Sequence, residues 1–437
     1  MALIDALTVP LDPTSAATLA ENGLEYRRVL TDTDAFAPFL QAVNRGFLGE
    51  EATEEQVTGS VEAMAARRMV GIYDPASVET SAPVATVDSW VVEMTTEPGR
   101  TLPMWGISGV TVSSTHRRRG IATAMLQGEL RAAADAGIPI AGLTVSEATI
   151  YGRFGFGPAV YTTRWEVETA RARWIGPRPE GRLDAVTREV LEKDLASVHE
   201  RVRLHHPGEV AGYVGLWRRA AGLNSGNTES RKIRGLRFTS PDGVVRGSLA
   251  YVLEEHPSDY TKNTLHIHHL IADGDDAYAA LWRFALEHDL VGTVKAYLLS
   301  EDEPVRWMIA DQRGIKAVTT DHEWLRILDV EAVLGSRSYR VPGSVTIQVS
   351  DPLGLAEGTW RLVVDDAGQA TVTAASTDEA GDADVTVSVA VLGSLLLGGV
   401  SARTLRTAGL VKASAETAQW LDQAFAPTAR PRLSLWY

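Results

Sequence analysis

The 437-residue chain contains no cysteine. This absence excludes disulfide bonds, thiolate metal ligands and a cysteine nucleophile, so any catalytic nucleophile or metal ligand must be of another kind. The chain also lacks an uninterrupted apolar run of the ~18 residues that a membrane-spanning helix needs, and its N-terminal stretch has no basic segment followed by an apolar one. The sequence therefore predicts no membrane span, and we expect a cytoplasmic protein.

Positive charge is scarce, with 42 lysines and arginines against 56 aspartates and glutamates and a net charge of −14. Binding to nucleic acid requires a positive face that neutralises phosphates, so this balance argues against a nucleic-acid partner and favours a cationic substrate. Hydrophobic residues make up 45% of the chain and charged residues 22%, as in ordinary globular proteins. The length indicates several domains.

Three segments differ in their patterning. Residues 1–167 mix helical stretches, such as Glu54 to Met69, with short β-rich runs, and residues 183–323 repeat this mixture after a linker rich in Pro, Gly and Arg. From residue 324 to residue 437, alternating strands are separated by DDAG-type turns and followed by short helices. These patterns predict two α/β domains and a third, α+β domain.

The first two segments contain an internal repeat. "GVTVSSTHRRRGIATAMLQGELRAAADAGIPIAGLTVSE" and "HHLIADGDDAYAALWRFALEHDLVGTVKAYLLSED" both predict a strand, a turn, a helix and a second strand. Where the first copy has three arginines and a glycine, the second has Asp273, Gly274, Asp275 and Asp276, which would repel an anion. The second copy is therefore expected to have lost an anion site that the first retains.

The basic turn of the first copy consists of Arg117, Arg118, Arg119 and Gly120 and directly precedes a predicted helix. A helix N-terminus offers unpaired N–H groups and a partial positive charge, and neighbouring arginines add charged donors. This combination favours a pyrophosphate, although the turn is neither a Walker A loop nor a GxGxxG loop. The alternative is a solvated basic turn or a nuclear-localisation-like patch.

With its flanking strand and helix, "RRRGIA" resembles the coenzyme A pyrophosphate loop of the GCN5-related N-acetyltransferases (GNAT family). The downstream "VSEATIYGRFGFGPA" resembles the family's segment that carries a general-acid tyrosine, which falls on Tyr151. The resemblance implies acetyl-CoA as cosubstrate, with the Val112 N–H polarising the acetyl carbonyl. The acetyl-CoA-binding residues that it implies are Val110, Val112, Arg117, Arg118, Arg119, Gly120, Ile121, Ala122 and Ser146.

Two GNAT-like domains followed by a sterol-carrier-like domain resemble the enhanced-intracellular-survival (Eis-like) acetyltransferases of actinobacteria. "THRRRG" and "SEATIYGRFGFGPA" carry this resemblance, and "ALWR" and "VLGSLLLGG" support it. It implies a homo-hexamer that acetylates primary amines of aminoglycosides, polyamines or lysine side chains. The family's aminoglycoside pocket has acidic residues before a phenylalanine matched to Phe47 and before the last residue, where this chain has Gly46 and Trp436.

The chain stops on the apolar "RLSLWY", so its end should be buried. In the Eis-like family the carboxylate of an aromatic last residue serves as the base for the amine, and the resemblance assigns this role to Tyr437. The alternative is a terminal strand whose rings simply pack.

Two further features have competing interpretations. His266 and His268 share a strand face and invite a metal-site hypothesis, but no third ligand follows at a fixed spacing, so we expect ordinary hydrogen bonds and no metal. "VSVAVLGSLLLGGV" could contact lipid, but core packing is the expected role. The alternative function is a lipid-binding or scaffolding protein whose acetyltransferase domains are both inactive.

Overall fold

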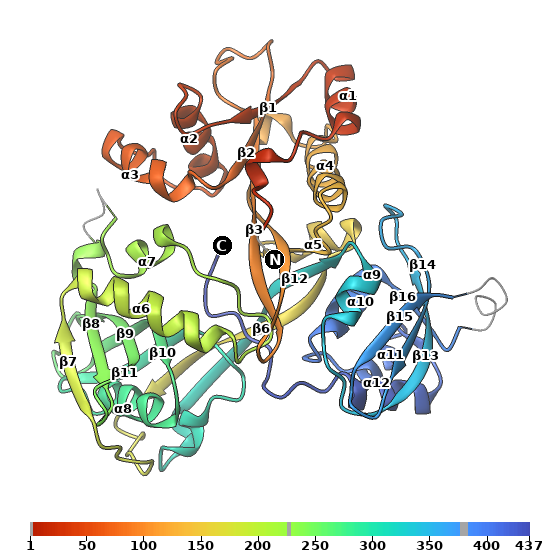
Figure 1. The fold of residues 1–437 in the computed structure, drawn as a ribbon. Helices are drawn as coiled ribbons and strands as arrows, with labels where there is room; N and C mark the ends of the chain where they lie inside the picture. Colours follow the sequence, from red (N-terminus) through yellow and green to blue (C-terminus); the bar gives the residue numbers. More distant parts are fainter. Residues whose placement is uncertain (1–2, 225–228, 376–382) are drawn as a thin grey trace. The chain divides into compact units, whose positions relative to one another are not determined.

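The computed structural model describes residues 3–224, 229–375 and 383–437 (Figure 1). The chain forms two compact units. Unit 1 comprises Met1–Val160, Asp321–Pro431 and Trp436–Tyr437, and unit 2 comprises Tyr161–Thr320 and Arg432–Leu435. No helix among the described residues is long and apolar enough to cross a membrane.

Unit 1 begins with a mixed sheet in the order β1-β2-β3-β4-β5-β12. Its strands are β1 (Glu25–Val29), β2 (Arg68–Tyr73), β3 (Ala85–Glu97), β4 (Arg100–Val112), β5 (Ile140–Thr144) and β12 (Ile315–Ile327), the last pairing with β5 through residues 323–327. All neighbours are antiparallel except β4 and β5, which are parallel and joined by a helix. Such a crossover leaves the ends of the two parallel strands next to the helix N-terminus.

The helical segments of this part are η1 (Ala6–Thr8), α1 (Pro13–Glu21), α2 (Phe36–Gly46), α3 (Glu54–Met64), η2 (Ser114–His116), α4 (Ile121–Asp135), α5 (Ala148–Tyr151) and η3 (Gly152–Phe154). Thr53 and Gln56 form a capping box that starts α3. The helix expected to reach Met69 ends at Met64, because the next residues form the fully buried strand β2. There the β-branched Val70 and Ile72 favour the sheet over helical continuation.

The hydrophobic core of this part lies between the sheet and α4. Buried side chains from β2, β3 and β4 pack against the apolar positions of α4, among them Ile72, Val87, Trp105, Met125, Leu126 and Leu130. Tyr151, Phe154 and Phe156 belong to the same cluster. The segment with the predicted catalytic tyrosine is therefore fixed to the helix that follows the basic turn.

The remainder of unit 1 is an α+β fold with a sheet in the order β15-β14-β13-β16-β17. Its elements are α9 (Val330–Gly335), β13 (Gly343–Ser350), β14 (Gly358–Val364), β15 (Ala370–Ala374), β16 (Val385–Ser388), α10 (Val389–Leu396), α11 (Ala402–Thr407), β17 (Lys412–Ala413) and α12 (Ala415–Ala424). The apolar α10 contains most of the segment "VSVAVLGSLLLGGV". Most of its side chains are buried.

Unit 2 contains a sheet in the order β6-β11-β10-β9-β8-β7. Its strands are β6 (Gly157–Glu168), β7 (Arg182–Val186), β8 (Arg234–Thr239), β9 (Val245–Glu254), β10 (Asn263–Ala272) and β11 (Val291–Leu299). Its helices are α6 (Arg188–Arg203), α7 (Val214–Ala220), η4 (Glu229–Lys232), α8 (Asp275–Leu286), η5 (Pro304–Trp307) and η6 (Gln312–Gly314). β10 and β11 are parallel and connected by α8, the same arrangement as β4, α4 and β5 (Figure 1).

Candidate active site

The basic turn lies between η2 and α4 and contains two left-handed residues. Gly120, at the N-cap of α4, has φ 76°, a conformation that glycine adopts without penalty. Arg118 has φ 62°, which is uncommon for a residue with a side chain and is typical of functional loops. The first-turn N–H groups of α4, including those of Ile121 and Ala122, have no carbonyl four residues earlier to bind. The turn therefore leaves N–H donors at the start of a 15-residue helix.

The three arginines of the turn are exposed. Arg119 Nη1 lies 3.6 Å from Asp74 Oδ2, and the same oxygen lies 3.0 Å from His116 Nε2. The hydrogen bond from His116 lowers the pKa of Asp74, so this carboxylate stays charged and holds the turn. Arg117 and Arg118 make no ion pair with any residue that the structure describes. Two guanidinium groups thus remain for an external anion.

A splay between β4 and β5 opens beside this turn. The two strands pair only from Met104 opposite Ile140 to Gly106 opposite Gly142. Beyond that point, residues 107–112 of β4 have no partner on β5 among the described residues. An unpaired strand edge exposes N–H and C=O groups that an extended ligand can bind.

A bulge in β4 orients this edge. Thr86 pairs with Thr111 and Asp88 with Ser108, so Gly109 (φ 60°) and Val110 together oppose a single β3 residue. After the bulge, the Ser113 N–H donates to the Val84 carbonyl at 2.8 Å, toward β3. Successive N–H groups of a strand point to opposite edges. The N–H groups of Val110 and Val112 therefore face the splay.

Tyr151 ends α5 and is 7% exposed. Its ring packs edge-on against Phe156 with centroids 6.2 Å apart. The hydroxyl forms no hydrogen bond within the described part of the chain. Burial, assisted by the Glu147 carboxylate, raises the pKa of the phenol. Tyr151 is thus a protonated donor whose hydroxyl is available to a ligand.

The last residue of the chain lies at the end of β5. The main-chain oxygen of Tyr437 accepts a 2.6 Å hydrogen bond from Thr144 Oγ1, two residues beyond the last β4 pairing. The Tyr437 hydroxyl donates to Glu323 Oε1 at 2.9 Å, and its ring lies edge-on to Trp90 at 5.3 Å. Tyr437, the residue predicted to supply the base, therefore has its main-chain oxygen at the end of β5, past the point where β5 parts from β4.

A charged residue just before β2 and another on β3 lie close to the Trp90 ring. Arg67 Nη1 contacts Asp88 Oδ1 at 2.8 Å, and the Arg67 guanidinium stacks on the Trp90 ring at 3.3 Å from its centroid. Burial raises the pKa of Asp88, although Arg67 opposes this. Sequence reasoning missed Trp90, Asp88 and Thr144 because alternating strand residues carry no local sign of what they face.

The structure also locates one residue predicted to bind acetyl-CoA and two positions predicted to affect the choice of amine. Ser146 is exposed just after β5, and no hydrogen bond or ion pair between described residues joins it to the basic turn. Gly46 ends α2, and a Cβ there would overlap the Thr111 side chain. Trp436 is half-exposed, with its ring 4.6 Å from that of His322. A side chain at position 46 would thus require α2 or Thr111 to shift.

In unit 2 the turn before α8 is acidic, as the repeat predicts. Asp275 and Asp276 occupy the first turn of α8, and Asp273 Oδ2 lies 3.0 Å from Arg201 Nε and 3.4 Å from Arg246 Nη1. The place that basic residues hold in unit 1 is therefore taken by carboxylates, one of which, Asp273, already binds two arginines of the same unit.

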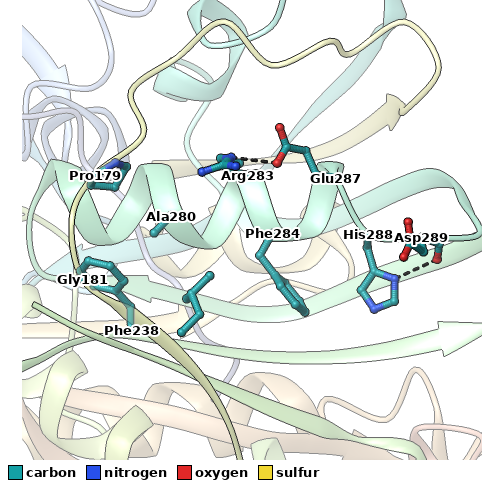
Figure 2. A pocket seen from close by; sticks show the side chains of 10 residues that line it. Pro179, Gly181, Phe238, Ala280, Arg283, Phe284, Glu287, His288 and Asp289 are labelled. Atoms are coloured by element: carbon teal, nitrogen blue, oxygen red, sulfur yellow. Dashed lines mark hydrogen bonds and ion pairs between the residues drawn. The ribbon is translucent and has the colours of Figure 1, made fainter.

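A pocket of about 520 Å³ lies along α8 in unit 2 (Figure 2). Phe238 and Phe284 supply apolar surface, and Arg283 donates to Glu287 at 2.8 Å at its polar margin. Residues 273–276, which take the place of the basic turn in unit 2, do not line it. The pocket therefore offers no second version of the unit 1 site.

His266 and His268 lie on β10. His266 Nε2 is 2.6 Å from Glu254 Oε2, an ordinary hydrogen-bonding contact. Among residues 3–224, 229–375 and 383–437, no group of three or more His, Asp or Glu side chains is arranged to hold a metal ion.

The chain is similar to known proteins along most of its length. Models of the acetyltransferase (GNAT) domain match residues 26–159 and 208–327, and a model of the sterol carrier protein domain matches residues 330–434. An uncharacterized N-acetyltransferase of Streptomyces avermitilis is 33% identical over 405 residues, covering 90% of this chain and 94% of that protein. The N-acetyltransferase Eis of Mycobacterium tuberculosis is 32% identical over 347 residues, covering 76% of this chain and 80% of that protein.

A solved structure agrees with these matches. The crystal structure of Eis1 from Mycobacterium abscessus has a TM-score of 0.79 at 27% identity, covering 94% of this chain and 100% of that one. Two GNAT domains followed by a sterol-carrier domain confirm the fold class predicted from the sequence, and with it the internal repeat.

Proposed function

The chain belongs to the Eis-like GNAT-family N-acetyltransferases, enzymes that depend on acetyl-CoA, and on this premise we propose that it acetylates a primary amine of a cationic substrate. The candidates are an aminoglycoside, a polyamine or a lysine side chain. The observation that carries the proposal is the Thr144 hydrogen bond to the Tyr437 carboxyl oxygen beside the β4–β5 splay.

Acetyl-CoA fits the residues of unit 1. Arg117, Arg118 and the N–H groups after Gly120 would hold its pyrophosphate, because they combine unpaired positive charge with helix N–H donors. The edge of β4 at Val110 and Val112 would bind the extended pantetheine arm. These residues, with Arg119, Ile121, Ala122 and Ser146, make up the proposed cosubstrate site.

Three groups would share the chemistry. The Tyr437 carboxylate accepts a proton from the attacking amine, and the Val112 N–H stabilises negative charge on the carbonyl oxygen. The Tyr151 hydroxyl protonates the departing thiolate, for which a phenol is a suitably weak acid. In support, the pairing of β4 with β5 ends before Val112, Tyr437 contacts the last residue of β5, and Tyr151 ends the helix that follows β5.

The net charge of −14 supports a cationic acceptor. This chain has Gly46 and Trp436 at the two positions where the family's aminoglycoside pocket has acidic residues. A Cβ at position 46 would overlap Thr111, which supports a pocket of different shape. Polyamines and lysine side chains are therefore included beside aminoglycosides.

The alternative function, lipid binding by a protein with inactive acetyltransferase domains, rests on the apolar α10. This helix instead packs on the GRFGFGPA segment of unit 1, where a Cβ at Gly157 would overlap the Ala390 carbonyl oxygen and one at Gly155 would press on Val389. Calorimetric titration with acetyl-CoA and with a fatty acid or sterol separates the two functions. Micromolar binding of the lipid alone would overturn the proposal.

The decisive experiment is a screen for CoA release with polyamines, aminoglycosides and lysine peptides, run on the full chain and on a variant lacking Tyr437. We expect turnover with at least one amine class, and loss of kcat with unchanged acetyl-CoA affinity in the variant. A cleanly C-terminally tagged enzyme with full activity would reject the carboxylate as the base.

The proposal also covers the oligomeric state of the chain, its compartment in the cell and its domain boundaries. We propose a homo-hexamer working in the cytoplasm, where its cosubstrate is made, and domains at 1–167, 183–323 and 324–437. Sedimentation velocity of the purified chain and fractionation of the source cells test the first two. Expression of the separate segments tests the third.

A further inference from the structure

We propose that Thr144 and Glu323 act together as positioning residues that fix the terminal residue at both of its ends. The inference rests on the proposed role of the Tyr437 carboxylate and adds the residues that orient this group. Thr144 and Glu323 are directly opposite each other in the antiparallel pairing of β5 with β12. One cross-strand pair therefore holds the carboxyl group and the phenol of the same residue.

The two contacts differ in what they fix. Thr144 Oγ1 donates to the carboxyl oxygen at 2.6 Å, a distance typical of a hydrogen bond to a charged acceptor. Glu323 Oε1 accepts from the phenol at 2.9 Å at a fully buried site. A residue bound at both ends cannot rotate about its own backbone, so the carboxylate keeps one direction relative to β5.

The surroundings strengthen the phenol contact. Tyr437 is buried, and burial together with the Glu323 carboxylate raises the pKa of its phenol well above the usual value. The phenol therefore stays a donor at all physiological pH values. The Trp90 ring, 5.3 Å away and edge-on, occupies another side of the ring. A terminal segment would otherwise fray, as chain ends commonly do.

The position of Thr144 at the end of β5 explains why fixing Tyr437 there would matter for catalysis. Thr144 is the last residue of β5, beyond Gly142, where β5 has already parted from β4. A carboxylate bound there lies beside the unpaired edge of β4 along which the proposed cosubstrate runs. A base must come within hydrogen-bonding reach of the proton it removes, and a misplacement of ~1 Å can cost ~10²-fold in rate.

The test compares conservative and non-conservative variants in the full chain. Thr144→Val removes the donor at nearly constant volume, and Thr144→Ser retains it. Glu323→Ala removes the acceptor, and Glu323→Gln retains an acceptor oxygen. For each variant, kcat and KM for acetyl-CoA and for the amine are measured, and the release of Tyr437 by a carboxypeptidase is timed.

We expect Thr144→Val and Glu323→Ala to lower kcat by ~10-fold to ~10²-fold, with KM for acetyl-CoA within about twofold of wild type, and to speed the release of Tyr437. Thr144→Ser and Glu323→Gln should restore most of both properties. In Thr144→Val, activity should also begin at a higher pH, because the carboxylate loses a donor that stabilises its charged form. A merely structural role would not move the pH profile.

The outcomes separate this inference from the proposed function. If Thr144→Val and Glu323→Ala leave both kcat and the release of Tyr437 unchanged, the positioning inference is wrong, even where deletion of Tyr437 abolishes activity. If these variants expose Tyr437 to the carboxypeptidase and kcat holds, the positioning stands and the carboxylate is not the base.

Discussion

Tyr151 is buried, and its hydroxyl makes no hydrogen bond with the described residues. Phe156 packs against the ring, and burial raises the pKa of the phenol, so the hydroxyl stays protonated and available as a donor. In the proposed reaction this hydroxyl would hydrogen-bond to the sulfur of acetyl-CoA and give it the proton as the C–S bond breaks. A residue that neither ionises early nor donates elsewhere suits that step.

Tyr151→Phe should therefore lower kcat by ~10²-fold or more while leaving the KM for acetyl-CoA within about twofold, because only the proton is lost. Steady-state kinetics at saturating amine provide the measurement. Because the raised pKa keeps the phenol protonated, the wild-type kcat should show no alkaline decline from this group below pH ~10. An unchanged kcat in the variant would assign the proton to water or to another side chain.

Arg118 adopts a left-handed conformation without glycine's freedom, and its guanidinium makes no ion pair among the described residues. Arg118→Glu should raise the KM for acetyl-CoA by ~10-fold or more, because a carboxylate then faces the pyrophosphate. Arg178→Glu is the matched control, since it reverses an exposed arginine outside the site and should leave this KM unchanged. Equal effects of the two variants would contradict the loop assignment.

At the level of elements, the strand, turn and helix around "RRRGIA" were predictable because their signals are local. Glycine at the N-cap, apolar periodicity in α4 and β-branched residues in β4 all lie within a few residues of one another. The left-handed Arg118 was not predictable, because only the neighbouring Gly120 carries a sequence sign of that conformation.

The contacts of Tyr437 with Thr144 and Glu323 could not be predicted from the spacing of residues in the sequence. Thr144 and Tyr437 are 293 positions apart, and nothing in "GLTVSE" distinguishes a hydroxyl that binds a carboxylate from one that faces solvent. Only the family resemblance pointed to Tyr437. Glu323 carried a weak signal, as a charged residue in the otherwise apolar "EWLRIL" strand, where a buried carboxylate requires a partner.

The GRFGFGPA segment allows a matched test at the element scale. Gly157→Ala should destabilise unit 1 by about 1–3 kcal/mol, because the new methyl group overlaps the Ala390 carbonyl oxygen of α10. Gly152→Ala should be neutral or stabilising by about 0.4–1 kcal/mol, since its φ of −56° is helical and a Cβ there meets nothing within 4 Å. Denaturant unfolding measures both, and equal losses would refute the packing role of α10.

At the scale of the molecule, unit 2 retains the acetyltransferase fold and holds a segment of the C-terminal region. The fully buried Glu209 accepts from Arg432 Nε at 3.0 Å and from Ser434 N and Oγ at 3.2 and 3.1 Å. Burial alone would raise the pKa of Glu209, but His199 and Arg432 outweigh it and lower the pKa to about 2.

The lowered pKa of Glu209 determines how its contribution to folding stability depends on pH. Its stabilisation is present above the unfolded value of 4.5 and is lost as the pH falls toward about 2. Glu209→Gln should cost about 3–5 kcal/mol at pH 7, because Arg432 loses its partner. Thermal unfolding from pH 7 to pH 3 should show the gap between variant and wild type narrowing below pH 4.5. A gap that is constant with pH would show that the carboxylate's charge is not the stabilising feature.

The whole chain should hold a single acetyl-CoA site. Asp275 and Asp276 begin α8, and Asp273 already binds Arg201 and Arg246, so a pyrophosphate at this turn would face three carboxylates. Calorimetry should therefore give one acetyl-CoA per chain. Reversing the charge with Asp275→Arg and Asp276→Arg together should leave that stoichiometry at one, because β10 and β11 still pair over five positions from Asn263 to Ile267 and the Asp273 ion pairs persist. Two sites per chain, before or after the change, would contradict the loss of the site in the second copy.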